Sequence, residues 1–184
     1  MDEVGRAHPH QQQLLDRAQE FFAEVEDLTP GKNLETRLNR DFGPGTPFYD
    51  TFAAIVRQAI NRNENWLATD EIDGPKYRRS IISAPCERSR YFSITAVYME
   101  SDDPYRGQYH LHPYGEINCV VPLSPSAEIM GMSGWQGAGW TSPGPGTHHY
   151  PEVRGGALVA LFFLPAGRIS YKHAKPGDPQ PVVV

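Results

Sequence analysis

Residues 110–116 restrict the local fold more than any other stretch, because they combine two histidines, a turn and a glutamate. Successive side chains of a β-strand alternate between its two faces, so His110 and His112 point to the same side. Residues 113–115, Pro-Tyr-Gly, have turn composition, and Glu116 then begins a returning strand. Two imidazoles and a carboxylate therefore converge from adjacent strands. Divalent transition metals prefer this kind of ligand set.

Short segments with strand-like alternation make up most of the chain after Trp66. In one of them, Phe92, Ile94, Ala96 and Tyr98 fall on one face. The 17 glycines and 17 prolines among 184 residues supply many turns. Many short antiparallel strands joined in this way predict a sandwich or a barrel. The predicted strands cover 77–84, 91–99, 106–112, 116–123, 127–132, 147–150, 156–164 and 168–171.

The first part of the chain instead carries apolar residues at helical spacing. A helix is predicted from about Gln11, with an apolar stripe that runs to Leu28, and a short helix over 34–40. A third helix is predicted to begin at Pro47, with Thr46 as its N-cap. We expect these helices to pack on the outside of the sheet or at a subunit interface.

The pattern predicts three parts: a helical extension over 1–65, a β-barrel over 66–171, and an extended, poorly ordered tail over 172–184. Near the N-terminus, His8 and His10 repeat the His-x-His spacing of the hairpin. Because no acidic residue follows them at a useful distance, the expectation there is a frayed tail.

Charge and hydropathy exclude several classes of partner. The net charge is −5 and no basic stripe is present, so nucleic acid is not an expected partner. No apolar stretch reaches membrane-spanning length. The chain has two cysteines, Cys86 and Cys119, and no recognisable signal peptide, which predicts reduced thiols and a cytoplasmic protein. A homodimer is expected, since sheet edges and helix faces need cover.

A second histidine pair, His148 and His149, follows about thirty residues after the glutamate. Adjacent residues of a strand face opposite sides, so without a bulge only one of the two can join the hairpin ligands. His-x-His-x-x-x-Glu followed by Gly-x-x-His, with the glycine at Gly146, resembles the two metal-binding motifs of the cupin superfamily. The resemblance implies a mainly β fold, a cupin-type double-stranded β-helix (jelly-roll) barrel with an N-terminal helical extension.

The cupin resemblance further implies one divalent transition metal held by His110, His112, Glu116 and His149. The second motif departs from the usual pattern, with Gly144 in place of its proline and Val153 in place of its closing asparagine. His148 therefore stays a rival for the fourth position. Three imidazoles and a carboxylate suit Fe, Mn, Zn, Ni or Cu equally.

Aromatic rings and arginines gather in and beside the predicted strands. A ring to stack on and a guanidinium fork suit a planar substrate with a carboxylate, although such residues are commonly core filling or solvated surface. The candidates for substrate binding are Arg78, Arg79, Tyr98, Trp140 and Arg154. The candidates for proton transfer are Glu116, Glu152 and Tyr150.

Longer segments resemble the 4-hydroxylaminobenzoate lyase family. They read DGPKYRRS at 73–80, FSITAVYM at 92–99, RGQYHLHPYGEIN at 106–118, HHYPEVRGGAL at 148–158 and LFFLPAGRISY at 161–171. The resemblance implies conversion of 4-hydroxylaminobenzoate to 3,4-dihydroxybenzoate (protocatechuate) and ammonia, in the breakdown of nitroaromatic acids.

That reaction is redox-neutral, because the hydroxylamine plus water balances the catechol plus ammonia. It needs no nicotinamide or flavin, and the chain has no Gly-rich dinucleotide fingerprint. Three alternatives stay open on the residues alone. They are a metal-dependent cupin dioxygenase of an aromatic acid, a non-catalytic cupin binding module, and a sugar-phosphate isomerase.

Overall fold

A computed structural model describes residues 8–182, in which three α-helices precede a β-barrel. The helices are α1 (Pro9–Glu24), α2 (Lys32–Phe42) and α3 (Pro47–Asn61). As predicted, α3 starts at Pro47 behind Thr46, whereas α1 stops before Leu28 because Val25 already has extended backbone. In the described part of the chain, no helix is both long and apolar enough to cross a membrane.

The described strands are mostly short, and a single turn of 3₁₀-helix (Glu87–Ser89) lies between two of the longer ones. They are β1 (Asp70–Glu71), β2 (Tyr77–Ser83), β3 (Phe92–Ser101), β4 (Tyr105–Arg106), β5 (His110–Leu111), β6 (Ile117–Pro122), β7 (Glu128–Gly131), β8 (Gly134–Gln136), β9 (Gly139–Thr141), β10 (His148–His149), β11 (Glu152–Arg154) and β12 (Gly156–Pro165).

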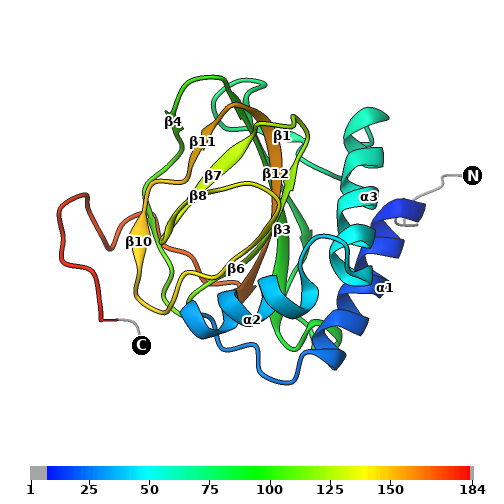
Figure 1. Cartoon of the computed structure of the whole chain (residues 1–184), viewed down its shortest axis with the longest axis horizontal. Coiled ribbons are helices and arrows are strands. Elements are labelled where there is room, and N and C mark those ends of the chain that lie inside the picture. The colour runs from blue at the N-terminus through cyan, green and yellow to red at the C-terminus, as the bar shows by residue number, and fades with distance from the viewer. Residues whose placement is uncertain (1–7, 183–184) are drawn as a thin grey trace, which may run out of the picture.

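Strand order identifies the barrel as a jelly roll. One sheet has the order β1-β2-β3-β12-β6-β9, the other has β4-β11-β7-β8, and β5 pairs with β10, all antiparallel. If β4 with β5 and β10 with β11 each count as one interrupted strand, the eight strands from β3 onward are divided four and four between two facing sheets in jelly-roll order. The predicted mainly β, cupin-type barrel with leading helices is therefore confirmed (Figure 1).

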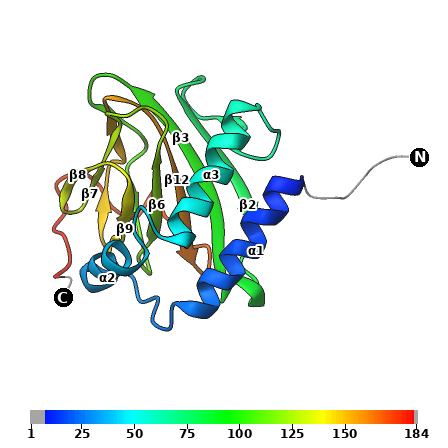
Figure 2. The same ribbon diagram turned by 45° about the vertical axis from the view of Figure 1, so that its right-hand side comes forward.

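The helices cover the outer face of the larger sheet, with α1 and α3 lying across β3, β12 and β2 (Figure 2). On β3, Ile94, Ala96 and Tyr98 belong to the core beneath the helices, whereas Met99 belongs to a second core inside the barrel. The residues that were predicted to share one face of this strand therefore face the helices. Both faces of the larger sheet are buried, as expected for a sheet between a helical layer and a second sheet.

Several strand boundaries differ from the sequence-based prediction. The predicted strand over 106–112 is broken into β4 and β5, and β10 is separated from β11 by Pro151, which has no N–H for the ladder. The Gly- and Trp-rich stretch 134–140 contains two strands, β8 and β9. The predicted strand over 168–171 is wrong, since only an isolated bridge joins Ser170 to Leu111.

Both predicted tails are more ordered than expected. His8 is the N-cap of α1, where its Nδ1 accepts a hydrogen bond from the backbone N–H of His10 at 3.3 Å, so the frayed-tail prediction is wrong for these two residues. Residues 1–7 lie outside the described part of the chain. At the other end the chain is extended, but Gln180 is hydrogen-bonded to both backbone groups of His148 and docks the tail on β10.

Candidate metal centre

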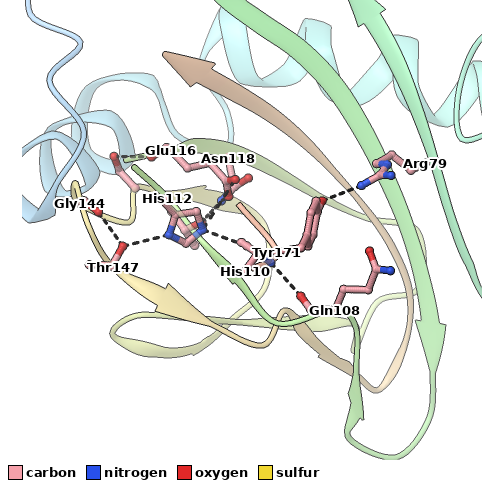
Figure 3. A network of polar contacts seen from close by, with 11 residues as sticks. Arg79, Gln108, His110, His112, Glu116, Asn118, Gly144, Thr147 and Tyr171 are labelled. Atoms are coloured by element: carbon pink, nitrogen blue, oxygen red, sulfur yellow. Dashed lines mark hydrogen bonds and ion pairs between the residues drawn. The ribbon is translucent and has the colours of Figure 1, made fainter. Parts of the chain in front are cut away.

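Three histidines meet where β5 pairs with β10. Figure 3 shows two of them, His110 and His112. β5 carries His110, His112 follows directly after it, and β10 pairs with β5 so that His149 lies opposite His110. One ring nitrogen from each residue lies within 4.8 Å of the other two. Strand alternation and antiparallel pairing are sufficient to produce this convergence.

His148 points to the other face of β10. Its Nδ1 lies 2.5 Å from the Tyr109 hydroxyl, and its Nε2 lies 3.2 Å from the carbonyl oxygen of Pro179 in the tail. The structure therefore brings His149, and not His148, into the group with His110 and His112. His148 instead ties the strand that carries His149 to the C-terminal segment.

Glu116 reaches the histidines from the turn before β6. Its Oε2 lies 3.8 Å from His112 Nε2, and its Oε1 accepts a hydrogen bond from Asn118 Nδ2 at 2.7 Å. The turn requires Gly115, whose φ is +81° and whose missing Cβ would lie 2.4 Å from the Cβ of Pro30. Only glycine combines this conformation with so close an approach.

The hydrogen-bond partners determine which ring nitrogens carry hydrogen. His110 Nδ1 lies 2.9 Å from the carbonyl oxygen of Gln108, which only accepts, so this nitrogen donates. The Thr147 hydroxyl donates to the carbonyl oxygen of Gly144 at 2.6 Å and therefore accepts from His112 Nδ1 at 3.0 Å. In neutral imidazoles both Nε2 atoms are then unprotonated, and they face each other at 3.0 Å. Two lone pairs at this distance repel each other, and a metal cation that both can bind relieves the repulsion.

Burial shifts the pKa of the three histidines and of Glu116. Burial lowers the pKa of His110 and His112, and it lowers the pKa of His149 to about 3, so all three rings are neutral at pH 7. Burial also raises the pKa of Glu116 to about 7, although the hydrogen bond from Asn118 acts in the opposite direction. Neutral imidazoles are the form that binds metals, and the carboxyl group can hold or release a proton near neutral pH.

A pocket of about 570 Å³, including its open mouth, lies inside the barrel beside the histidines. Its wall is mostly apolar, with a few polar groups. In addition to His110, Glu116 and His149, the lining includes Tyr77, Arg79, Met99, Asn118, Thr141 and Tyr171.

Arg79 and Tyr171 both line the pocket, and Tyr171 lies between Arg79 and His110 (Figure 3). The guanidinium of Arg79 donates to the Tyr171 hydroxyl at 2.6 Å, and the Tyr171 ring centroid lies 6.0 Å from that of His110. One tyrosine ring therefore spans the space between the guanidinium and the histidines. Both residues also line an outer hollow that contains the exposed Ile81, so they lie between the pocket and the surface.

Three of the predicted substrate-binding residues lie on the helix-covered side of the sheet instead. The guanidinium of Arg78 lies 4.2 Å from the ring centroid of Tyr98, whose hydroxyl donates to Glu100 at 2.7 Å. Trp140 is fully buried and stacks on Phe21 with ring centroids 5.1 Å apart. None of the three lines the pocket, because each occupies the outward position in the alternation of its strand.

Glu152, Tyr150 and Arg154 are also placed away from the histidines. Val153 is buried inside the barrel, so its neighbours Glu152 and Arg154 face outward, where they form ion pairs with Arg106 and Glu128 respectively. Tyr150 packs edge-on against Tyr109, with ring centroids 4.8 Å apart. The structure therefore corrects the expected roles of these residues: none of the three lines the pocket.

Four polar lining residues escaped the sequence-based prediction: Tyr77, Asn118, Thr141 and Tyr171. Two of them carried a usable signal, since Tyr77 is two residues before Arg79 and Asn118 is two residues after Glu116, on the same strand face in each case. Thr141 and Tyr171 arrive from distant segments, so only the fold reveals them.

Comparison with known proteins shows which family this chain is similar to. A family model described as 4-hydroxylaminobenzoate lyase matches residues 16–171. A protein named 4-hydroxylaminobenzoate lyase from Nocardioides sp. (strain LMS-CY) is 54% identical over 167 residues, which cover 91% of this chain and 98% of the relative. One of the same name from Pseudomonas putida is 49% identical over 173 residues, which cover 90% of this chain and 97% of the relative.

A solved structure, the DMSP lyase DddQ from Ruegeria pomeroyi DSS-3, aligns with 92% of this chain and 100% of its own, at 17% identity and a TM-score of 0.43. The assignment of the barrel rests on its strand order and not on this likeness.

Proposed function

The chain belongs to the 4-hydroxylaminobenzoate lyase family, and from this we propose that it converts 4-hydroxylaminobenzoate to protocatechuate and ammonia at the histidine cluster. One water molecule enters for each ammonia that leaves, and the reaction involves no net oxidation. Such a reaction belongs in the breakdown of nitroaromatic acids, after reduction of a nitro group to a hydroxylamine. The expected homodimer and cytoplasmic location belong to the same proposal.

The observation that carries the proposal is the pair of facing, unprotonated Nε2 atoms of His110 and His112, 3.0 Å apart beside a pocket. A divalent transition metal held by His110, His112, His149 and Glu116 suits this donor set. When bound, such a metal supplies Lewis acidity toward the hydroxylamine oxygen and lowers the pKa of bound water. Gln108 and Thr147 support binding by fixing each ring in the tautomer that presents Nε2.

Arg79 is the residue that we assign to the substrate carboxylate. It is the one arginine among the three predicted candidates that lines the pocket, and its guanidinium can form a two-pronged hydrogen bond with a carboxylate. In a 4-substituted benzoate, the carboxylate and the nitrogen lie at opposite ends of one ring. The Tyr171 ring itself fills the space between Arg79 and His110. A substrate ring of similar length that lies beside it would have its carboxylate at Arg79 and its nitrogen at the histidines.

Glu116 is placed to handle protons at the reacting end. Its pKa is about 7 when no cation is bound, and once it holds the cation as a carboxylate it can accept a proton from water but has none to give. The hydrogen bond from Asn118 holds Oε1, which leaves Oε2 directed toward His112. The apolar wall around Met99 and Phe162 limits water around the ring, which favours a defined orientation of the substrate.

The test is to replace His110 with alanine and measure bound metal and ammonia release in the same preparation. We expect the variant to lose most of its metal and at least about 100-fold of its activity, because a ligand and its lone pair are removed. His173→Asn, an exposed histidine away from the pocket, is the matched control and should change neither quantity. Full activity in metal-stripped wild-type protein would contradict the role of the metal.

A further inference from the structure

A second group of side chains that could bind a metal lies at the N-terminal end of α1. Figure 2 shows this end of α1 outside the barrel. His8, His10 and Glu64 each offer one ligand atom, and these three atoms lie within 4.8 Å of one another. We propose that this group is a second metal site, which binds a zinc-like divalent cation and fastens the start of α1 to the turn after α3. The family activity assigns no role to these residues, and the proposal is independent of that activity.

The ends of two helices fix the backbone of all three residues. His8 is the N-cap of α1 and His10 is its second residue, with Pro9 between them to hold the first helical position. Glu64 lies just beyond α3, where its N–H donates to the carbonyl oxygen of Ala59 at 3.0 Å. The ligands therefore belong to ordered backbone and not to a loose tail, although 54 residues separate His10 from Glu64.

The side chains around Glu64 are arranged as in a metal site. The Glu64 side chain is only 5% exposed, with Oε1 2.6 Å from His10 Nδ1 and Oε2 3.3 Å from His8 Nδ1. Trp66 Nε1 donates to Oε2 at 2.7 Å and its ring stacks on that of His8, with centroids 6.5 Å apart. A hydrogen bond of this kind commonly holds a ligating carboxylate in its orientation.

Two imidazoles and one carboxylate form a known zinc donor set, with a fourth position for water. The His8 side chain is 35% exposed, so a cation and its water can reach the site from solvent. Three features weaken binding here relative to the barrel site. The Nδ1 lone pair of His8 already accepts the N-cap hydrogen bond from the His10 N–H. The close contact between His10 Nδ1 and Glu64 Oε1 must open to admit a cation, and the positive end of the α1 dipole opposes one. We therefore expect the second site to bind zinc at least about tenfold more weakly than the barrel site.

The experiment is equilibrium dialysis of the untagged full chain against zinc chloride, with circular dichroism to verify folding. We expect wild-type protein to bind two equivalents of zinc, one tight and one weaker. His10→Asn and Glu64→Gln should each lose the weaker equivalent and keep the tight one. His110→Ala should do the opposite, and the exposed control His173→Asn should keep both.

Cobalt(II) gives a second readout, because its visible absorption reports on ligand number and type. We expect a second absorption component in wild-type protein that is absent in His10→Asn and Glu64→Gln. The proposal is overturned if folded wild-type protein binds a single equivalent, or if both variants keep the weaker equivalent. It is also overturned if His173→Asn loses that equivalent. No substrate is involved, so failure of this site and failure of the proposed lyase activity are distinguished.

Discussion

At the residue scale, the proposed metal centre depends on which nitrogen of each imidazole carries hydrogen. Gln108 and Thr147 each accept from Nδ1, so the two Nε2 lone pairs are left facing each other. His110 and His112 alone would repel each other in this arrangement, and a metal held there as proposed would relieve the repulsion. The two hydrogen-bond acceptors are therefore as important for the centre as the ligands themselves.

The first prediction concerns the pH dependence of metal binding. Glu116 has a pKa of about 7 and must lose its proton to bind a cation, whereas burial keeps His149 neutral, with a pKa of about 3. Below the pKa of Glu116 the carboxyl group is protonated, so metal affinity should fall about tenfold per pH unit from about pH 7 to about pH 5. Glu116→Gln should bind more weakly but lose most of this slope. A slope of two or more protons in wild-type protein, measured by titration calorimetry, would contradict the assignment.

The second prediction concerns the carboxylate end of the pocket. Arg79→Met removes a charge-assisted hydrogen bond to the substrate, so KM should rise about 10- to 100-fold while metal content stays unchanged. Arg79→Lys should recover part of the loss. The matched control is Arg78→Met, whose side chain lies on the helix-covered face beside Tyr98, and its KM should stay near that of wild type. An equal rise of KM in both methionine variants would refute the role of Arg79.

At the scale of elements, strand alternation explains what the sequence could and could not predict. The convergence of His110, His112 and Glu116 was predictable because they are close in sequence and strand geometry fixes their relation. The inner face of the larger sheet was not predictable, because the helices bury its outer face as well. Alternation alone therefore could not tell Arg79, which faces the pocket, from Tyr98, which faces the helices.

The third prediction concerns the C-terminal segment. Gln180 is hydrogen-bonded to both backbone groups of His148 and so holds β10, the strand that carries His149. Gln180→Ala should therefore raise the metal dissociation constant of the barrel site about tenfold, with little effect on folding. Gln13→Ala, on an exposed position of α1, is the control and should leave the constant unchanged. Metal titration with a chelator as competitor measures both, and identical constants in the two variants would refute a role for the tail.

The fourth prediction separates core packing from substrate binding. Trp140 is fully buried against Phe21, and its Nε1 donates to the carbonyl oxygen of Phe42 at 2.8 Å. Trp140→Phe should lower the free energy of unfolding by about 1–3 kcal/mol in urea titrations, without a change in KM. Trp135→Phe, on a partly exposed strand, should cost less. A changed KM in folded Trp140→Phe protein would restore the original substrate-binding prediction.

At the scale of the whole molecule, contacts between segments that are distant in sequence determine which histidines come together. The pairing of β5 with β10 brings His149 to His110 and turns His148 away, a choice that motif spacing alone had left unresolved. The same is true of His10 and Glu64, which lie 54 residues apart and meet only because α1 and α3 pack side by side. The many short strands predicted a sandwich or a barrel, and the resemblance to cupins implied the jelly roll. Which residues meet across the barrel was not predictable.

The most direct test of the account is a turnover experiment without oxygen. Metal-reconstituted wild-type protein is incubated anaerobically with 4-hydroxylaminobenzoate, and ammonia and protocatechuate are measured over time. The account predicts the two products in a one-to-one ratio at a rate unaffected by oxygen, with loss of the reaction after metal removal and recovery after metal is returned. A requirement for oxygen, or full turnover in the metal-stripped protein, would contradict it.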